Sequence, residues 1–217
     1  MNIFALSIDP TKAARMMCDK HIPKMIVESA QMMASALRRH EDTLMKGFPQ
    51  YESVDDLFTQ KQIVTKKGTP YKGGYANHPC TVWAGDTWAN FYWLGEHACG
   101  LLREFRLRFG ERSVGHACST PIKQMLRLGI FVGDVLSEKT AFAMAMPDEY
   151  KQEGKEVIAY RDYYFAEKAD FAKWERGREA PTWWTAKRRT QMVEAQTQYD
   201  AYSRVSVGSA WPNWRVD

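Results

Sequence analysis

The segment from Thr81 to Phe109 constrains the fold of this chain more than any other. Large apolar and aromatic side chains recur through it at helical spacing, and Gly110 follows the last of them. This spacing is typical of a helix that packs against a core, and glycine is a common residue at a helix end. The side chains are Val82, Trp83, Trp88, Phe91, Tyr92, Leu94, Leu101, Leu102, Phe105 and Phe109.

Weaker patterns predict further helices on both sides of this one. Pro23 either interrupts a helix that begins near residue 11 or starts a new helix that extends to Arg39. If it interrupts the helix, a kink between His21 and Glu28 would open a pocket. Other helices are expected over about 120–128, 137–145, 155–175 and 186–203.

The predicted fold class is therefore mainly α. We expect a compact single-domain helical bundle with a short N-terminal extended segment and a long, irregular basic loop over residues 41–80. Residues 1–184 would form the catalytic or binding domain, and residues 185–217 a helical and aromatic C-terminal extension.

The composition argues against a membrane-spanning or secreted protein. The chain has 217 residues, of which 45% are hydrophobic and 26% charged, as in ordinary globular proteins. No apolar run approaches the roughly 20 residues that span a bilayer, and the first residues do not resemble a signal peptide. We expect a cytoplasmic protein with no membrane partner. The four cysteines form no Cys-x-x-Cys pair, so buried thiols are expected. The alternative is a zinc site built from these cysteines and the five histidines, which their spacing does not support. We expect no metal and no cofactor.

The long loop is basic and carries no acid between Asp56 and Asp86. Lys66, Lys67 and Lys72 lie there among glycines, and such a loop can approach a phosphate backbone closely. The alternative is a solvated surface loop.

A cluster of polar residues interrupts an otherwise apolar helix. Lys20 and His21 precede Lys24 and Glu28, and helical spacing would place the last three on one face. Imidazole, ammonium and carboxylate groups can transfer protons or hold a phosphate. A carboxylate among core-type residues is costly unless it is paired or used, so Glu28 is the main catalytic candidate. A surface Lys–Glu pair beside a helix-end histidine is the alternative.

Two other segments carry candidate binding residues. Asn77 and His78 precede Pro79, where they could contact a phosphate, cap the following helix, or do both. Tyr160, Arg161 and Lys168 belong to a stretch that alternates aromatic and basic residues. Exposed, this stretch would stack bases and neutralise phosphates; buried, its aromatic residues would form a helix core.

The spacing Asp19-x-His21-x6-Glu28 resembles that of the pyrimidine-dimer DNA glycosylases of phage, in which it ends in the catalytic glutamate. Phe4–Pro10 and Asn77-His78-Pro79 are similar to bacterial members, and the resemblance covers about residues 1–110. It implies an all-α domain that kinks duplex DNA and extrudes a base, with DNA as the partner. Glu28 would be the catalytic carboxylate, and His21, Asn77 and His78 would contact the substrate. A phage-encoded protein would act in the host cytoplasm.

The second residue departs from this family. Those enzymes form a Schiff base through an amine that methionine removal exposes on a small residue, whereas Asn2 is bulky enough to disfavour that removal. The nucleophile would then be the Met1 amine or a lysine, Lys20 or Lys24. Two alternatives remain: a transferase that modifies a pyrimidine base or nucleotide, and a non-catalytic protein that binds or sequesters nucleic acid or a pyrimidine nucleotide.

Overall fold

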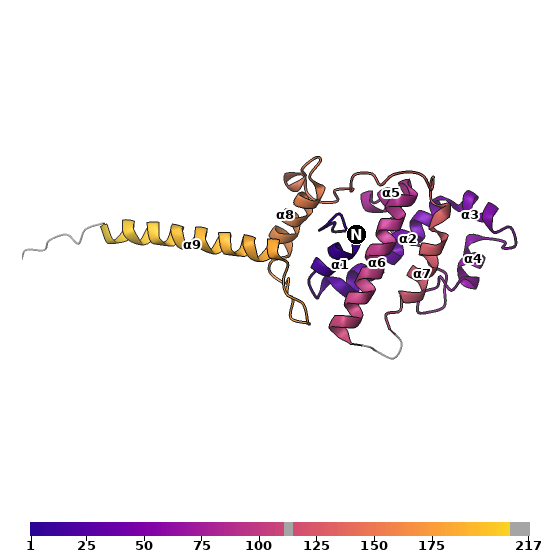
Figure 1. The fold of residues 1–217 in the computed structure, drawn as a ribbon, viewed down its shortest axis with the longest axis horizontal. Coiled ribbons are helices and arrows are strands. Elements are labelled where there is room, and N and C mark those ends of the chain that lie inside the picture. The colour runs from indigo at the N-terminus through magenta and orange to yellow at the C-terminus, as the bar shows by residue number, and fades with distance from the viewer. Residues whose placement is uncertain (111–114, 209–217) are drawn as a thin grey trace, which may run out of the picture. The chain divides into compact units, whose positions relative to one another are not determined.

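The computed structural model describes residues 1–110 and 115–208, with side chains to residue 198 (Figure 1). Every regular element in these ranges is a helix, and the β pairing found there is one isolated bridge between Val64 and Pro70. The predicted mainly α fold class is thus confirmed. Met1–Ala180 forms one compact unit and Pro181–Asp217 a second. Whether residues 1–184 and 185–217 differ in function stays a prediction.

The longest connections between the described helices are residues 61–78 and 132–147. The bounds of the helices are α1 Pro10–Met16, α2 His21–Arg39, α3 Glu41–Gly47, α4 Val54–Gln60, α5 Pro79–Asp86, α6 Trp88–Phe109, α7 Ser119–Arg127, the 3-10 helices η1 Leu128–Phe131 and η2 Asp148–Tyr150, α8 Glu156–Lys168, and α9 Thr182–Gly208. None of these helices combines the length and the apolar content needed to cross a membrane.

Helix α6 is the centre of the first unit and packs against α1, α2, α5 and α7 (Figure 1). Glycines in α6 allow the backbones of neighbouring helices to come close to it. A Cβ on Gly100 would lie 2.9 Å from the Cβ of Ala14 in α1, and one on Gly95 would lie 2.4 Å from a methyl carbon of Leu126 in α7. Larger residues at these positions would push the helices apart.

The long helix expected from Thr81 to Phe109 is divided in two, which corrects that prediction. Thr87 has an extended backbone, and its hydroxyl accepts a hydrogen bond from the Asn90 amide at 3.0 Å, so α6 begins with its own cap. The buried Asn90 side chain donates to the carbonyl of Trp83 at 2.8 Å. These hydrogen bonds satisfy backbone groups at the break between α5 and α6. The spacing of apolar residues gives no sign of them.

Helix α2 is continuous from His21 onward, so the predicted kink between His21 and Glu28 is absent. Pro23 lies in the first turn, where a backbone donor is not needed within the helix. The helix expected from residue 11 ends earlier, at Met16. Residues 17–20 then form the connection that leads into α2.

Two further expectations need correction. Residues 41–80 are not wholly irregular, because α3 and α4 occupy the first half, and the Ser53 hydroxyl caps α4. No helix forms over 137–145. Instead Phe142 is buried against Trp83 and Trp93, and this packing replaces local helical bonds. The polar helix predicted over 186–203 lies within α9, whereas 209–217 of the predicted extension lie outside the described residues.

Candidate active site

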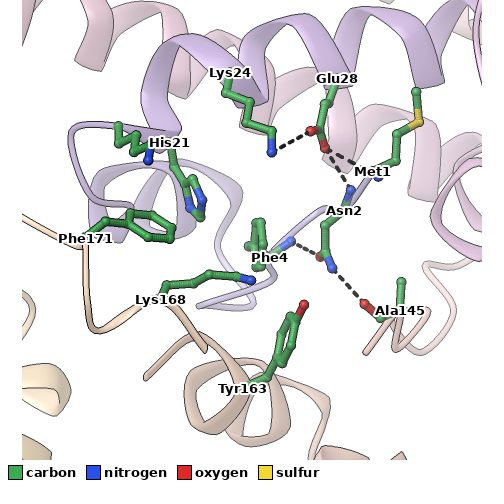
Figure 2. A pocket seen from close by; sticks show the side chains of 11 residues that line it. Met1, Asn2, Phe4, His21, Lys24, Glu28, Ala145, Tyr163, Lys168 and Phe171 are labelled. Atoms are coloured by element: carbon green, nitrogen blue, oxygen red, sulfur yellow. Dashed lines mark hydrogen bonds and ion pairs between the residues drawn. The ribbon is translucent and has the colours of Figure 1, made fainter. Parts of the chain in front are cut away.

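A pocket of about 360 Å³ opens between the N-terminal segment, the start of α2 and the end of α8 (Figure 2). It is rich in aromatic rings and amines and contains one carboxylate. Its lining residues are Met1, Asn2, Phe4, Lys20, His21, Lys24, Glu28, Ala145, Tyr163, Lys168 and Phe171. Its volume is within the range of small-molecule sites in proteins.

Glu28 holds the carboxylate of this pocket, and its side chain is 15% exposed. One oxygen, Oε2, accepts a hydrogen bond from the backbone amide of Asn2 at 3.0 Å and lies 4.0 Å from the amine of Met1. The other, Oε1, lies 3.6 Å from the ammonium of Lys24. Figure 2 shows the carboxylate between these nitrogens. A carboxylate so placed can accept a proton from an amine or stabilise a developing cation.

The first two residues are held firmly beside Glu28. The Met1 side chain is 1% exposed, and the Thr81 hydroxyl lies 3.7 Å from its sulfur. The Asn2 side chain accepts a hydrogen bond from the Phe4 amide and donates one to the Ala145 carbonyl, each at 2.8 Å. These contacts fix the N-terminal amine in space before any ligand binds.

His21 lies on the pocket wall and is 4% exposed. Burial, reinforced by the charges of Lys24, Lys168 and Lys20, lowers the pKa of His21 from 6.5 to about 4. The ring is therefore neutral at pH 7. Its Nδ1 lies 2.7 Å from the Tyr164 hydroxyl. His21 thus acts as a neutral hydrogen-bonding ring rather than as a cation.

Aromatic rings and lysines form the rest of the wall. Phe4 stacks on His21 with ring centroids 5.1 Å apart, and it also stacks on Tyr163 at 6.1 Å. The Lys20 ammonium lies 4.5 Å from the centre of the Phe171 ring, and that of Lys168 lies 5.0 Å from the centre of Tyr163. This combination of ring faces and cations suits a ligand that contains a base and phosphate.

The pocket brings together six of the residues predicted from sequence: Met1, Lys20, His21, Lys24, Glu28 and Lys168. His78 caps α5, since its Nδ1 accepts a hydrogen bond from the Cys80 amide at 3.2 Å. Burial and the N-terminal charge lower the pKa of His78, and Glu28 opposes them. His78 therefore lies within electrostatic range of the site, whereas Asn77 is exposed on the preceding turn.

The remaining predicted residues lie elsewhere. Lys66 and Lys67 are exposed in the loop, and their contact with phosphate stays a prediction. Lys72 forms an ion pair with Asp55, which also pairs with Arg38. These two cations lower the pKa of Asp55. The Lys72 side chain is 70% exposed even so, and its contact with phosphate also stays a prediction.

Tyr160 and Arg161 also lie outside the pocket lining, and a phosphate contact of Arg161 stays a prediction. Tyr160 is fully buried, and its hydroxyl donates to the Ala143 carbonyl at 2.5 Å. The Arg161 guanidinium donates to the Leu6 carbonyl at 2.9 Å. Both side chains are used in packing the N-terminal and 143–145 segments, so the buried alternative holds for Tyr160, and neither residue lines the pocket.

Sequence reasoning did not select Asn2, Phe4, Tyr163 and Phe171 as site residues. Phe4 has a φ of +37°, an uncommon backbone conformation that no pattern in the sequence indicates. Tyr163 and Phe171 belong to the aromatic and basic stretch after residue 160, and that alternation was the one available signal.

The fold and site define a helical protein whose cationic pocket surrounds a carboxylate and an N-terminal amine. The sequence model of a family described as pyrimidine dimer DNA glycosylase matches residues 1–113. The chain belongs to that family. No curated protein and no solved structure matches it. Tyr163, Lys168 and Phe171 lie beyond the matched residues.

Proposed function

We propose that this protein is a DNA glycosylase/lyase that removes a damaged or modified pyrimidine. The observation that carries the proposal is the Met1 amine 4.0 Å from Glu28 Oε2, inside a pocket with three lysines. Membership of the glycosylase family supports the reaction class. The target base must leave the duplex to reach such a pocket.

The reaction begins with a proton transfer. An ammonium group cannot attack, so Glu28 accepts a proton from the Met1 amine. The amine nitrogen then forms a bond to C1′ of the deoxyribose while the bond from C1′ to the base breaks, and the base leaves with that electron pair and takes up a proton. Glu28 gives its proton to the departing base and is ionised again. The sugar ring then opens as the bond from C1′ to O4′ breaks and O4′ takes a proton from the amine nitrogen, which leaves a protonated Schiff base between C1′ and that nitrogen. The carboxylate of Glu28 stabilises this positive charge.

Lys24 is the alternative nucleophile, because its ammonium lies 3.6 Å from Glu28 Oε1. Its side chain is 65% exposed, whereas that of Met1 is buried, so the amine of Met1 is the better-positioned group. Lys20 and Lys168 would contact phosphates on either side of the extruded nucleotide. His21, as a neutral ring, would either donate a hydrogen bond to the base or sugar or accept one from it.

Borohydride trapping tests this proposal. The substrates are duplexes with a thymine dimer, an abasic site or 5-hydroxymethyluracil, and intact mass measures the adduct. We expect a covalent adduct with the wild-type protein, loss of it in Glu28→Gln, and its retention in the exposed control Glu149→Gln. Peptide mapping then assigns the bond to Met1, Lys20 or Lys24, and also verifies that the α-amine belongs to Met1.

The same experiment separates the alternatives. The pocket also suits a free pyrimidine nucleotide, because four amines surround one carboxylate. A transferase or a sequestering protein would give no trapped adduct on any of the three duplexes. Tight nucleotide binding that survives Glu28→Gln, without product, would replace the glycosylase with a binding protein.

A further inference from the structure

One wall of the pocket comes from outside the family-matched residues. Tyr163, Lys168 and Phe171 face the pocket across from Glu28 (Figure 2). We call these three residues the outer wall. We propose that the outer wall binds the extruded nucleotide and that Asp19 is the positioning residue that holds it in place. This inference rests on the proposed function and extends it to residues that the family match does not reach.

Asp19 joins the connection before α2 to the segment that follows the outer wall. Its amide donates to the Lys173 carbonyl at 2.9 Å, and its Oδ2 accepts from the Glu175 amide at 2.7 Å. The Trp174 indole donates to the Met16 carbonyl at 3.3 Å. Two stretches of chain more than 150 residues apart are thus bonded along their backbones.

A buried arginine secures the same carboxylate. The side chain of Arg108 has 0% exposure, and its Nη1 lies 3.1 Å from Asp19 Oδ1. Its Nε lies 3.0 Å from Oε2 of Glu104. Glu104 in turn accepts two hydrogen bonds from Arg178, at 3.0 and 2.8 Å. Residues 173–178 are therefore anchored at both ends, by Asp19 and by Glu104.

This anchor reaches the pocket directly. Phe171 precedes the anchored segment by two residues, and His21 follows Asp19 by two. The rings of Phe171 and His21 meet edge to face with centroids 5.4 Å apart, and the Lys20 ammonium lies over the Phe171 ring. If Asp19 released the segment, Phe171 would lose its fixed position opposite His21. Lys168, three residues earlier, would lose its position as well.

The outer wall has the chemistry of a nucleotide contact. Its rings offer faces for a base, and the Lys168 ammonium offers a charge for a phosphate. Base stacking on an aromatic side chain contributes about 1–3 kcal/mol per base. We therefore expect that loss of the Phe171 ring weakens binding of a lesion-containing duplex by about tenfold.

A double-mutant cycle tests the proposal. Binding of a duplex that carries a 2′-fluoro 5-hydroxymethyluracil nucleotide, which keeps the base and resists cleavage, is measured by fluorescence anisotropy at fixed salt, for wild type, Asp19→Asn, Phe171→Ala and the double variant. Each single variant should bind about tenfold more weakly, and the double variant no more weakly than the weaker single one. The exposed Asp148→Asn serves as the control.

Hydrogen exchange of residues 170–178 supplies a readout independent of activity. Asp19→Asn should accelerate exchange there. Arg178→Gln removes the ion pair with Glu104 at the other end of the segment, and it should accelerate exchange as well without disrupting the buried core, because the Arg178 side chain is partly exposed. Faster exchange with unchanged DNA binding would overturn the role of the outer wall. About a hundredfold loss in the double variant would overturn the role of Asp19. If the wild type binds none of the duplexes, the proposed function itself fails, whatever the exchange shows.

Discussion

The buried histidine of the site makes the fold sensitive to acid. Burial and three nearby lysines lower the pKa of His21 to about 4 in the folded chain, against 6.5 for an exposed histidine. Between these values the unfolded chain binds a proton that the folded chain does not, so stability falls as pH falls from about 6.5 to about 4. At about 1.4 kcal/mol per pH unit, His21 accounts for a loss of about 3 kcal/mol across that window.

Replacement of His21 by phenylalanine isolates this contribution. The variant keeps an aromatic ring against Phe4 but removes the 2.7 Å contact with the Tyr164 hydroxyl, which still accepts a hydrogen bond from the Cys18 amide, at a cost of about 1 kcal/mol at every pH. We expect the variant to be less stable than wild type at pH 7 and more stable by about 2 kcal/mol near pH 4.5.

Urea unfolding monitored by circular dichroism at half-unit steps from pH 4.5 to 7.5 measures the free energy of unfolding of both proteins. The informative quantity is the difference between them, because contributions common to both proteins cancel. A difference that stays constant across this range would refute the reasoning, since it would mean that His21 titrates alike in both states.

Three further perturbations test the packing around the site. His97 is fully buried, neither of its ring nitrogens has a hydrogen-bond partner, and burial lowers its pKa to about 3. His97→Phe should therefore raise the temperature of the unfolding midpoint, and by more at pH 5 than at pH 7. A lower midpoint at both pH values would contradict this. Arg108→Met leaves the Asp19 carboxylate without its cation and Glu104 with Arg178 alone, and should cost about 3–5 kcal/mol in urea unfolding, whereas a loss below about 1 kcal/mol would mean that Asp19 finds another partner. Gly73 has a φ of +78°, and a Cβ there would lie 2.9 Å from the Ser35 backbone nitrogen. Gly73→Ala should therefore lower the melting temperature more than Gly68→Ala, whose φ is +77° but whose surroundings are open, and equal losses would rule out the steric part.

Local patterns predicted the parts of the fold that depend on local chemistry. The spacing of apolar residues predicted α7, the last two turns before Gly110 and most of α2, because a helix buries one face at a fixed period. The same reasoning wrongly predicted one helix in place of α5 and α6, because the break at Thr87 depends on a hydrogen bond from the Asn90 amide rather than on hydrophobic spacing. It also placed a helix over 137–145, where packing of Phe142 overrides local preference.

In the candidate site too, some contacts follow from local spacing and others depend on how distant segments pack. Lys24 and Glu28 share a helix, so their proximity follows from their spacing. Tyr160 and Lys168 are both on α8, yet only Lys168 reaches the pocket, because the rotation of α8 against the N-terminal segment decides which side is buried. The sequence gives no sign that Lys72 pairs with Asp55 on α4, because 17 residues separate them and no helix joins them.

Local spacing predicts a helical chain with a carboxylate, an imidazole and a lysine at the start of one helix, because these features depend on residues within a few turns of each other. The positions of the Met1 amine beside Glu28 and of Phe171 opposite His21 depend instead on long-range packing. Those contacts join residues 27 to 150 positions apart along the chain. No local period specifies them, and they follow from how Asn2, Asp19 and Arg108 bond to distant backbone.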